Sequence, residues 1–247
     1  MSWSVLLWGG ETAEPAALAG PWLEQPWVGQ VMVLSPSAPA GAGRPDGRLA
    51  LLPGEEFISP AKLAECLERV LTPYLAVVGE SWRVSPGGAF PRRAGQVFES
   101  APVGLLYSYW PRDEGGFPGE VMVQPAFQEG SARDTFPMGP LVCLRAETAR
   151  RLAAGLQPTR WSALAELKLR LGEEGGVRLV PEALYRARAV ESGPAGERQF
   201  DYLRPAFRAR QLELETVFTS HLKRTGAWLP PPAGPLPPPD RPAPCLA

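Results

Sequence analysis

Short apolar runs alternate with helical patterns through the first half of this chain. Continuous apolar runs of four to eight residues predict buried strands, and apolar residues repeated every three or four positions predict helices. The predicted strands are Trp3–Trp8, Gln30–Leu34 and Tyr74–Val78, and the predicted helices are Glu14–Glu24 and Pro60–Leu71. Alternating strands and helices are typical of a mostly parallel sheet covered by helices on both faces. We therefore expect an α/β fold.

The middle of the chain predicts a hairpin followed by a strand and a helix. Gly104–Trp110 and Glu120–Val123 have strand patterns, and the glycines and proline of Asp113–Gly119 predict a turn between them. Leu141–Leu144 is a short apolar run, and a helix is expected over Ala146–Gly155.

The stretch Thr159–Arg188 predicts a helix, a glycine turn and a strand that ends on Val-Pro-Glu-x-Leu-Tyr. Pro205 then begins the longest predicted helix, and Gly226 ends it. His221, the only histidine, falls near the apolar side of that helix, where we expect a packed and hydrogen-bonded imidazole. The Pro- and Gly-rich interval Ser35–Gly47 follows the second strand, and ligands usually bind at the carboxyl ends of parallel strands.

The composition favours one folded domain with a tail. A chain of 247 residues with 45% hydrophobic content can bury the core of one α/β domain, which we place at residues 1–228. Nine of the nineteen residues from 229 to 247 are proline, so this segment cannot join a helix or a sheet. We expect it to be an extended or disordered tail.

Charge and cysteine usage narrow the function classes. The formal net charge of −1 gives no basic field for nucleic acid, so no nucleic-acid partner is expected. The first basic residue is Arg44, and no apolar run is long enough for a transmembrane segment, so we expect a cytoplasmic protein. Cys66, Cys143 and Cys245 are widely spaced and form no CxxC pair, which predicts free thiols.

The order of elements resembles the inverting, nucleotide-sugar-dependent glycosyltransferases of family 2. Ser4–Leu7, Gln30–Leu34 and Thr72–Val78 resemble the first strand, the second strand and the strand that leads to the family's metal motif. The helix and strand within Thr159–Arg188 resemble its acceptor side. The resemblance implies a single domain of GT-A type, with a mostly parallel mixed sheet flanked by helices.

A bacterial subgroup of that family is more similar still. Its recurring phrases resemble Gln128–Asp134, Phe200–Tyr202 and His221–Lys223. The implied activity is sugar transfer from a nucleotide-activated donor to a glycan or other hydroxyl acceptor, in bacterial surface polysaccharide or glycoconjugate synthesis.

The resemblance places Glu166 at the position of the catalytic base, with Glu where Asp is usual. An inverting transferase needs a carboxylate to take the proton from the attacking hydroxyl. A second interpretation is structural, because Glu166 and Arg170 are spaced to form an i,i+4 ion pair on a helix. Both interpretations stand at this point.

The metal motif departs from the family pattern. Gly79-Glu80-Ser81 occupies the position of DxD, the pair of aspartates that holds Mg²⁺ or Mn²⁺. Hard cations prefer several oxygen ligands, and one carboxylate supplies few. Glu80 is thus either a lone metal ligand or a helix cap. No cofactor is assigned with certainty, and Mg²⁺ and Mn²⁺ are the candidates.

The donor-binding positions also depart from the family. Trp8 and Ser37 stand where the family has its nucleotide-recognition residues, and Trp8 either stacks on a base or packs in the core. Arg133 and Asp134 are expected near the donor phosphates, where an arginine would do part of the work of a metal, or else they form a local ion pair. The departures from the family's metal and nucleotide motifs favour an alternative function, namely a catalytically degenerate GT-A module that acts as a binding or scaffold partner.

Overall fold

The computed structural model describes residues 2–9, 14–39, 46–54, 58–79, 82–115, 117–128, 138–190 and 205–230, the last range with side chains from 208. Its strands are β1 (Trp3–Trp8), β2 (Val28–Ser35), β3 (Leu49–Pro53), β4 (Tyr74–Val78), β5 (Trp82–Pro86), β6 (Leu105–Glu114), β7 (Phe117–Met122), β8 (Leu141–Arg145), β9 (Val177–Ala183) and β10 (Tyr185–Ala189). Its helices are η1 (Pro15–Ala19, a 3₁₀ turn), α1 (Gly20–Leu23), α2 (Pro60–Glu68), α3 (Phe90–Ser100), α4 (Ala146–Ala153), α5 (Ala163–Gly175) and α6 (Pro205–Arg224).

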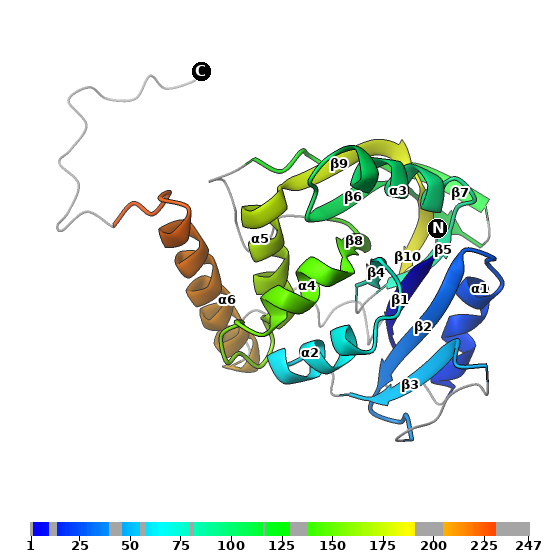
Figure 1. The fold of residues 1–247 in the computed structure, drawn as a ribbon, viewed down its shortest axis with the longest axis horizontal. Helices are drawn as coiled ribbons and strands as arrows, with labels where there is room; N and C mark the ends of the chain where they lie inside the picture. The colour runs from blue at the N-terminus through cyan, green and yellow to red at the C-terminus, as the bar shows by residue number, and fades with distance from the viewer. Residues whose placement is uncertain are drawn as a thin grey trace, which may run out of the picture.

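A single mixed sheet organises these elements (Figure 1). The strand order is β3-β2-β1-β4-β8-β6-β10-β5, and β7 and β9 also pair with β6. The first four strands in this order are parallel, whereas β8 runs antiparallel to both β4 and β6. The predicted α/β fold with a mostly parallel mixed sheet is confirmed.

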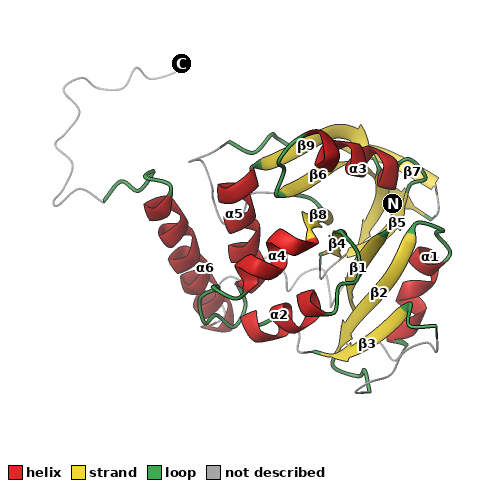
Figure 2. Ribbon diagram, in the orientation of Figure 1, coloured by secondary structure: helices red, strands yellow, loops and turns green. Residues whose placement is uncertain are grey.

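Helices cover both faces of the sheet (Figure 2). Alternate residues of β1 point to opposite faces, so Val5 packs with α1 and α3, whereas Leu6 packs with α2, α4 and α5. Every residue of β1 is buried, which is why the strand is apolar at successive positions instead of alternating. The two faces together form the core.

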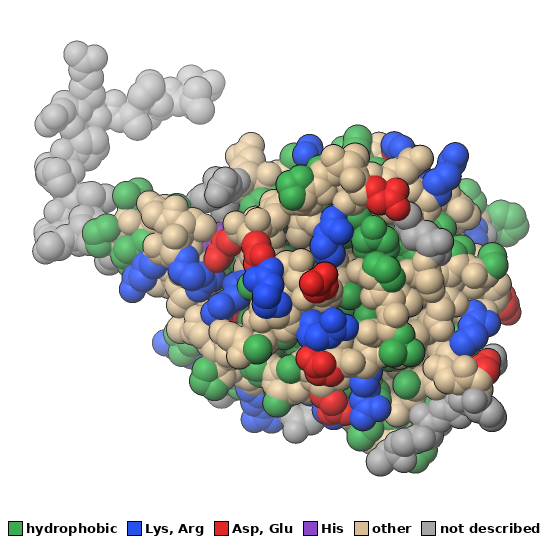
Figure 3. Space-filling model, in the orientation of Figure 1, with side chains coloured by type: hydrophobic (Ala, Val, Ile, Leu, Met, Phe, Trp, Pro, Cys, Tyr) green, Lys and Arg blue, Asp and Glu red, His purple; other side chains and the backbone are tan. Residues whose placement is uncertain are grey.

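Acidic and basic side chains are interspersed on the face drawn in Figure 3. Ion pairs such as the exposed Arg151–Glu174 and the partly buried Lys62–Glu65 belong to the helices α2, α4 and α5. Such a surface agrees with the near-neutral net charge of the chain. Within the described residues, none of the helices combines the length and the apolar character that a bilayer span requires.

The predicted elements are largely present, with four omissions. The three N-terminal strands, α2, α4, α5 and α6 occur where the patterns place them, and the helix predicted at Glu14–Glu24 is η1 followed by the one-turn α1. The predicted hairpin is present with a shorter turn, because β6 continues to Glu114 and β7 begins at Phe117. The sequence patterns missed β3, β5, α3 and the separate strand β10. Cys66 and Cys143 are buried free thiols, as predicted. Cys245, Phe200–Tyr202 and the tail beyond residue 230 lie outside the described residues.

Polar contacts hold α6 against α5. His221 is 3% exposed, and its Nδ1 lies 2.6 Å from Glu173 Oε1, which confirms the packed imidazole. Arg224 donates two further hydrogen bonds to Glu173. Burial opposes ionisation of Glu173, but the bonds from Arg224 and His221 outweigh it and lower the pKa of this carboxyl group.

We expect Glu213→Ala to loosen α6. The Glu213 carboxylate accepts hydrogen bonds from the backbone N–H groups of Arg160 and Trp161, at 2.9 and 2.7 Å. Losing both bonds should lower the free energy of unfolding by about 2 kcal/mol. Glu215→Ala is the matched control, because Glu215 bonds Gln211 on the same helix, and it should change stability by less than about 0.5 kcal/mol. Chemical denaturation of the two variants measures the difference, and equal effects would contradict this account of α6 docking.

Candidate functional site

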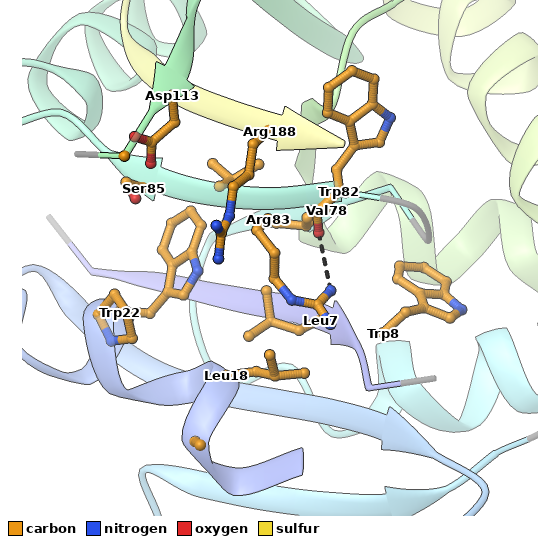
Figure 4. A pocket seen from close by; sticks show the side chains of 14 residues that line it. Leu7, Trp8, Leu18, Trp22, Val78, Trp82, Arg83, Ser85, Asp113 and Arg188 are labelled. Carbon is orange, nitrogen blue, oxygen red and sulfur yellow. Dashed lines mark hydrogen bonds between the residues drawn. The ribbon is translucent and has the colours of Figure 1, made fainter. Parts of the chain in front are cut away.

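A cavity of about 380 Å³ opens at the carboxyl ends of β1 and β4 (Figure 4). Its floor comes from β1 and β4, one wall from η1 and α1, and the other from β5, β6 and β10. The lining residues are Leu7, Trp8, Ala17, Leu18, Pro21, Trp22, Val78, Trp82, Arg83, Val84, Ser85, Asp113, Gly115 and Arg188. The location is the one where α/β sheets usually bind ligands.

Two arginines face each other in the cavity wall. Arg83 on β5 and Arg188 on β10 are direct partners in the antiparallel register, so their side chains leave the sheet on the same face. Burial and the nearby charge of Arg188 lower the pKa of Arg83. Figure 4 shows both guanidinium groups pointing into the space between the β5–β10 wall and Leu18. The cavity therefore presents two positive charges to whatever occupies it.

Tryptophans in the cavity walls pack against other aromatic rings. Trp22 is 2% exposed and meets Trp27 edge to face, with ring centroids 6.2 Å apart. Trp82, which is partly exposed, meets Trp110 edge to face, and Trp110 in turn stacks on Tyr185 at an interplanar angle of 6°. Aromatic surfaces of this kind suit the flat rings of nucleobases and the apolar faces of sugars.

The cavity carries different chemistry at its two ends. In Figure 4, Ser85 and Asp113 lie at one end and Trp8 and Trp82 at the other, with the guanidinium groups between them. A ligand that fits this order has an aromatic or apolar part, an anionic middle and hydroxyl groups. The hydroxyl groups would meet the acceptor oxygens of the Ser85–Asp113 end.

Two of the predicted donor-binding residues lie in the described part of the chain. Trp8 lines the cavity, but its side chain is 5% exposed and packs with Leu6 and Met32 in the core, which is the packing interpretation of this residue. Ser37 follows β2 as an exposed residue whose hydroxyl lies 2.9 Å from Ser35 Oγ. Ser37 is not among the residues that line the cavity.

Glu166 lies in the first turn of α5 and is fully buried. Its Oε1 accepts hydrogen bonds from Arg170, at 2.9 Å from Nε and 2.7 Å from Nη2, so the predicted i,i+4 pair is present. Its Oε2 accepts a hydrogen bond from the backbone N–H of Gln157 at 2.9 Å. Both oxygens are thus engaged, Oε1 within α5 and Oε2 with the segment after α4, and Glu166 is not part of the cavity lining. Its assignment as a base stays a prediction.

The remaining predicted residues, Glu80, Arg133 and Asp134, lie outside the described residues. The described element that follows is the strand β5, which begins at Trp82, and both interpretations of Glu80 stay predictions. The described cavity wall offers few ligands for a metal ion, because Asp113 is its one carboxylate. Within the described ranges, no three His, Cys, Asp or Glu side chains form a cluster that could hold a metal ion. Because Mg²⁺ and Mn²⁺ need several oxygen ligands, this donor set does not fit the metal that the family implies.

Sequence patterns missed the residues that define the cavity. Arg83, Ser85 and Arg188 occupy the two short strands β5 and β10, whose pairing joins segments about a hundred residues apart. The sequence did contain one signal for β5, because Trp82-Arg83-Val84-Ser85 alternates apolar and polar residues as a short strand does. Nothing in the sequence indicates that Arg188 lies opposite Arg83.

Comparisons with known proteins identify the fold. No protein-family model matches the chain, and no curated protein matches it. The structure is similar to residues 1–349 of S. aureus TarS in complex with UDP-GlcNAc, with a TM-score of 0.53 and 10% identity over 90% of this chain and 73% of that one. The same TarS fragment in complex with UDP gives 0.53 and 11% over 90% and 72%, and a mycobacterial protein gives 0.51 and 13% over 91% and 75%. These likenesses, at low identity, show the fold: one α/β domain of GT-A type, as expected.

Proposed function

We propose that this protein binds a nucleotide-activated sugar in the cavity and transfers the sugar to a hydroxyl acceptor. The observation that carries the proposal is the opposed pair Arg83 and Arg188, which faces a cavity at the carboxyl edge of a GT-A-like sheet. Guanidinium groups match the oxygens of a diphosphate, and the tryptophan walls match a base or a sugar ring.

The fold supports this class of ligand. TarS, which has a similar fold, binds UDP-GlcNAc and UDP in its crystal structures. At such low identity the likeness shows the fold but not the identity of the donor. The proposal therefore names a class of ligand, the nucleoside diphosphate sugars, and leaves the nucleotide open. The resemblance to the bacterial subgroup links the proposed activity to surface polysaccharide or glycoconjugate synthesis.

The proposed reaction is a displacement at the anomeric carbon. The acceptor oxygen forms a bond to that carbon, the bond from carbon to the diphosphate oxygen breaks, and the nucleoside diphosphate leaves with the electron pair. The hydroxyl proton passes to a base. Negative charge grows on the diphosphate as it leaves, and Arg83 and Arg188 are placed to stabilise it. The resemblance assigns the base to Glu166, and such a role requires its carboxylate to exchange Arg170 or Gln157 for the acceptor.

A second candidate is a GT-A module that binds the donor without chemistry. The observation in its favour is the environment of Glu166, whose oxygens are both bonded and whose side chain is fully buried. A scaffold or binding partner would keep the cavity and lose the base.

The test combines binding with turnover. We expect at least one of UDP, GDP, dTDP and CDP to bind in a calorimetric titration, and more tightly than its monophosphate, because the second phosphate adds charge-assisted hydrogen bonds. We also expect release of that diphosphate from the matching nucleotide sugar when an acceptor glycan is added. Binding without release across a broad acceptor panel would favour the scaffold, and an absence of binding by all four nucleotides would contradict both candidates.

A further inference from the structure

We propose that Arg83 and Arg188 hold the diphosphate directly, in the role that a divalent metal plays in related folds, so that nucleotide binding needs no metal ion. The inference rests on the proposed function for the identity of the ligand. The anion site itself rests on the geometry of the two arginines.

The register of the sheet forces the two charges together. Arg83 and Arg188 are directly opposite in the β5–β10 pair, and like charges at opposed positions destabilise a sheet. Placing Arg83 on the wall of a cavity adds to this cost, because it is partly buried and loses part of its hydration, whereas Arg188 stays exposed. A dianion between the two guanidinium groups would turn the repulsion into attraction.

The two arginines also keep donors available. Arg83 Nη1 donates one hydrogen bond, at 3.3 Å, to the carbonyl oxygen of Trp82, and a guanidinium carries five N–H donors. Neither Arg83 nor Arg188 forms an ion pair with any acidic group in the described ranges. The remaining donors are of the kind that binds phosphate oxygens in a bidentate manner.

Arg83 is partly buried and Arg188 is exposed, and the other partly buried arginines in the described ranges have partners. Some pair with carboxylates and others donate to backbone carbonyl groups. The carboxylate pairs are Arg93–Glu182, Arg170–Glu166 and Arg224–Glu173, and the carbonyl donors are Arg48, Arg145 and Arg150. Against this background, the partly buried Arg83, which lies opposite Arg188 and has no carboxylate partner in the described ranges, is an exception that a bound anion explains.

The described cavity wall suits an anion better than a cation. It presents two guanidinium groups and one carboxylate, Asp113, so a metal placed there would meet more positive than negative charge. A diphosphate placed there would meet more charges of opposite sign than of its own sign. The structure therefore assigns charge neutralisation to the arginines.

The test measures anion binding with the metal removed. Inorganic pyrophosphate and the nucleoside diphosphates are titrated into the protein in EDTA and again in Mn²⁺, and we expect affinities that agree within about twofold. Arg83→Gln and Arg188→Gln should each weaken binding by about tenfold or more, whereas the lysine variants, which keep the charge and lose the fork, should weaken it less. Arg112→Gln is the control, since Arg112 is an exposed residue of β6 outside the cavity lining, and it should leave binding unchanged.

The outcomes separate this inference from the proposed function. Nucleotide binding that requires Mn²⁺ and survives both glutamine variants would overturn the arginine site and leave the proposed function standing. Pyrophosphate binding in EDTA that is lost in the variants, without binding of any nucleotide, would support the site and contradict the proposed function. An absence of all anion binding would overturn both. Circular dichroism verifies folding, and the lysine variants supply the result if a glutamine variant does not fold.

Discussion

Replacing Glu166 by alanine should lower the free energy of unfolding by roughly 3 kcal/mol. The substitution removes a fully buried carboxylate and leaves the backbone N–H of Gln157 and the partly buried guanidinium of Arg170 without their acceptor. For a domain of this size, a loss of that magnitude lowers the melting temperature by about 6–12 °C.

Scanning calorimetry measures this loss, and Glu174→Ala is its matched control. Glu174 is on the same helix but pairs with Arg151 at the surface, so its loss should cost less than about 1 kcal/mol. Similar melting temperatures for the two variants would contradict the buried ion pair.

Glu166→Gln tests the predicted base, because a base role requires turnover per folded molecule to fall by about a hundredfold or more, whereas a purely structural role leaves it within a few fold.

Gly104→Ala should lower the free energy of unfolding by about 3 kcal/mol. A Cβ atom at position 104 would lie 2.2 Å from the carbonyl oxygen of Leu171 and 2.9 Å from its carbonyl carbon, which are backbone atoms of α5. The reason is that α5 crosses the start of β6 without side chains between them, at Gly104 and Gly175, and Gly104 N donates to Gly176 O at 3.1 Å. Relief of the clash requires the helix to move away from the sheet.

Urea denaturation of Gly104→Ala and Gly88→Ala provides the comparison. A Cβ at Gly88 would meet no atom within 4 Å, so that variant should change stability by less than about 0.5 kcal/mol in either direction. A Gly104→Ala protein as stable as the parent would show that α5 does not lie against β6 in this way.

Three of the four strands of the parallel half were predictable because each carries its own signal, whereas β3 was missed. β1, β2 and β4 are apolar at nearly every position and are buried on both faces, and a continuous apolar run reports that burial without any knowledge of neighbours. The helices between them show apolar residues on one side. Local pattern and global position agree in this part of the chain.

The elements that the patterns missed have weaker local signals. α3 begins at Phe90 and carries Arg92, Arg93 and Gly95, a sequence that is rich in charge and includes a poor helix former, and it is stabilised by packing Phe90 and Phe98 against Trp3. β5 and β10 are five residues each and are half exposed. Such segments are stabilised mainly by packing and strand pairing with other elements of the fold.

The candidate site illustrates the same difference. Glu166 was identified from its local phrase, and that phrase contained both the family position and the Arg170 pair that the structure shows. The opposed arginines were not found, because the pairing of Arg83 with Arg188 depends on the register of two distant strands. Charge, burial and cavity position become visible only when the sheet is assembled.

The most direct test of the central claim is a crystal structure of the protein with the nucleoside diphosphate that binds most tightly. The account predicts electron density for the diphosphate between Arg83 and Arg188, with phosphate oxygens at about 2.7–2.9 Å from nitrogen atoms of both guanidinium groups. A nucleotide bound at another surface, or one whose phosphates contact neither arginine, would contradict it.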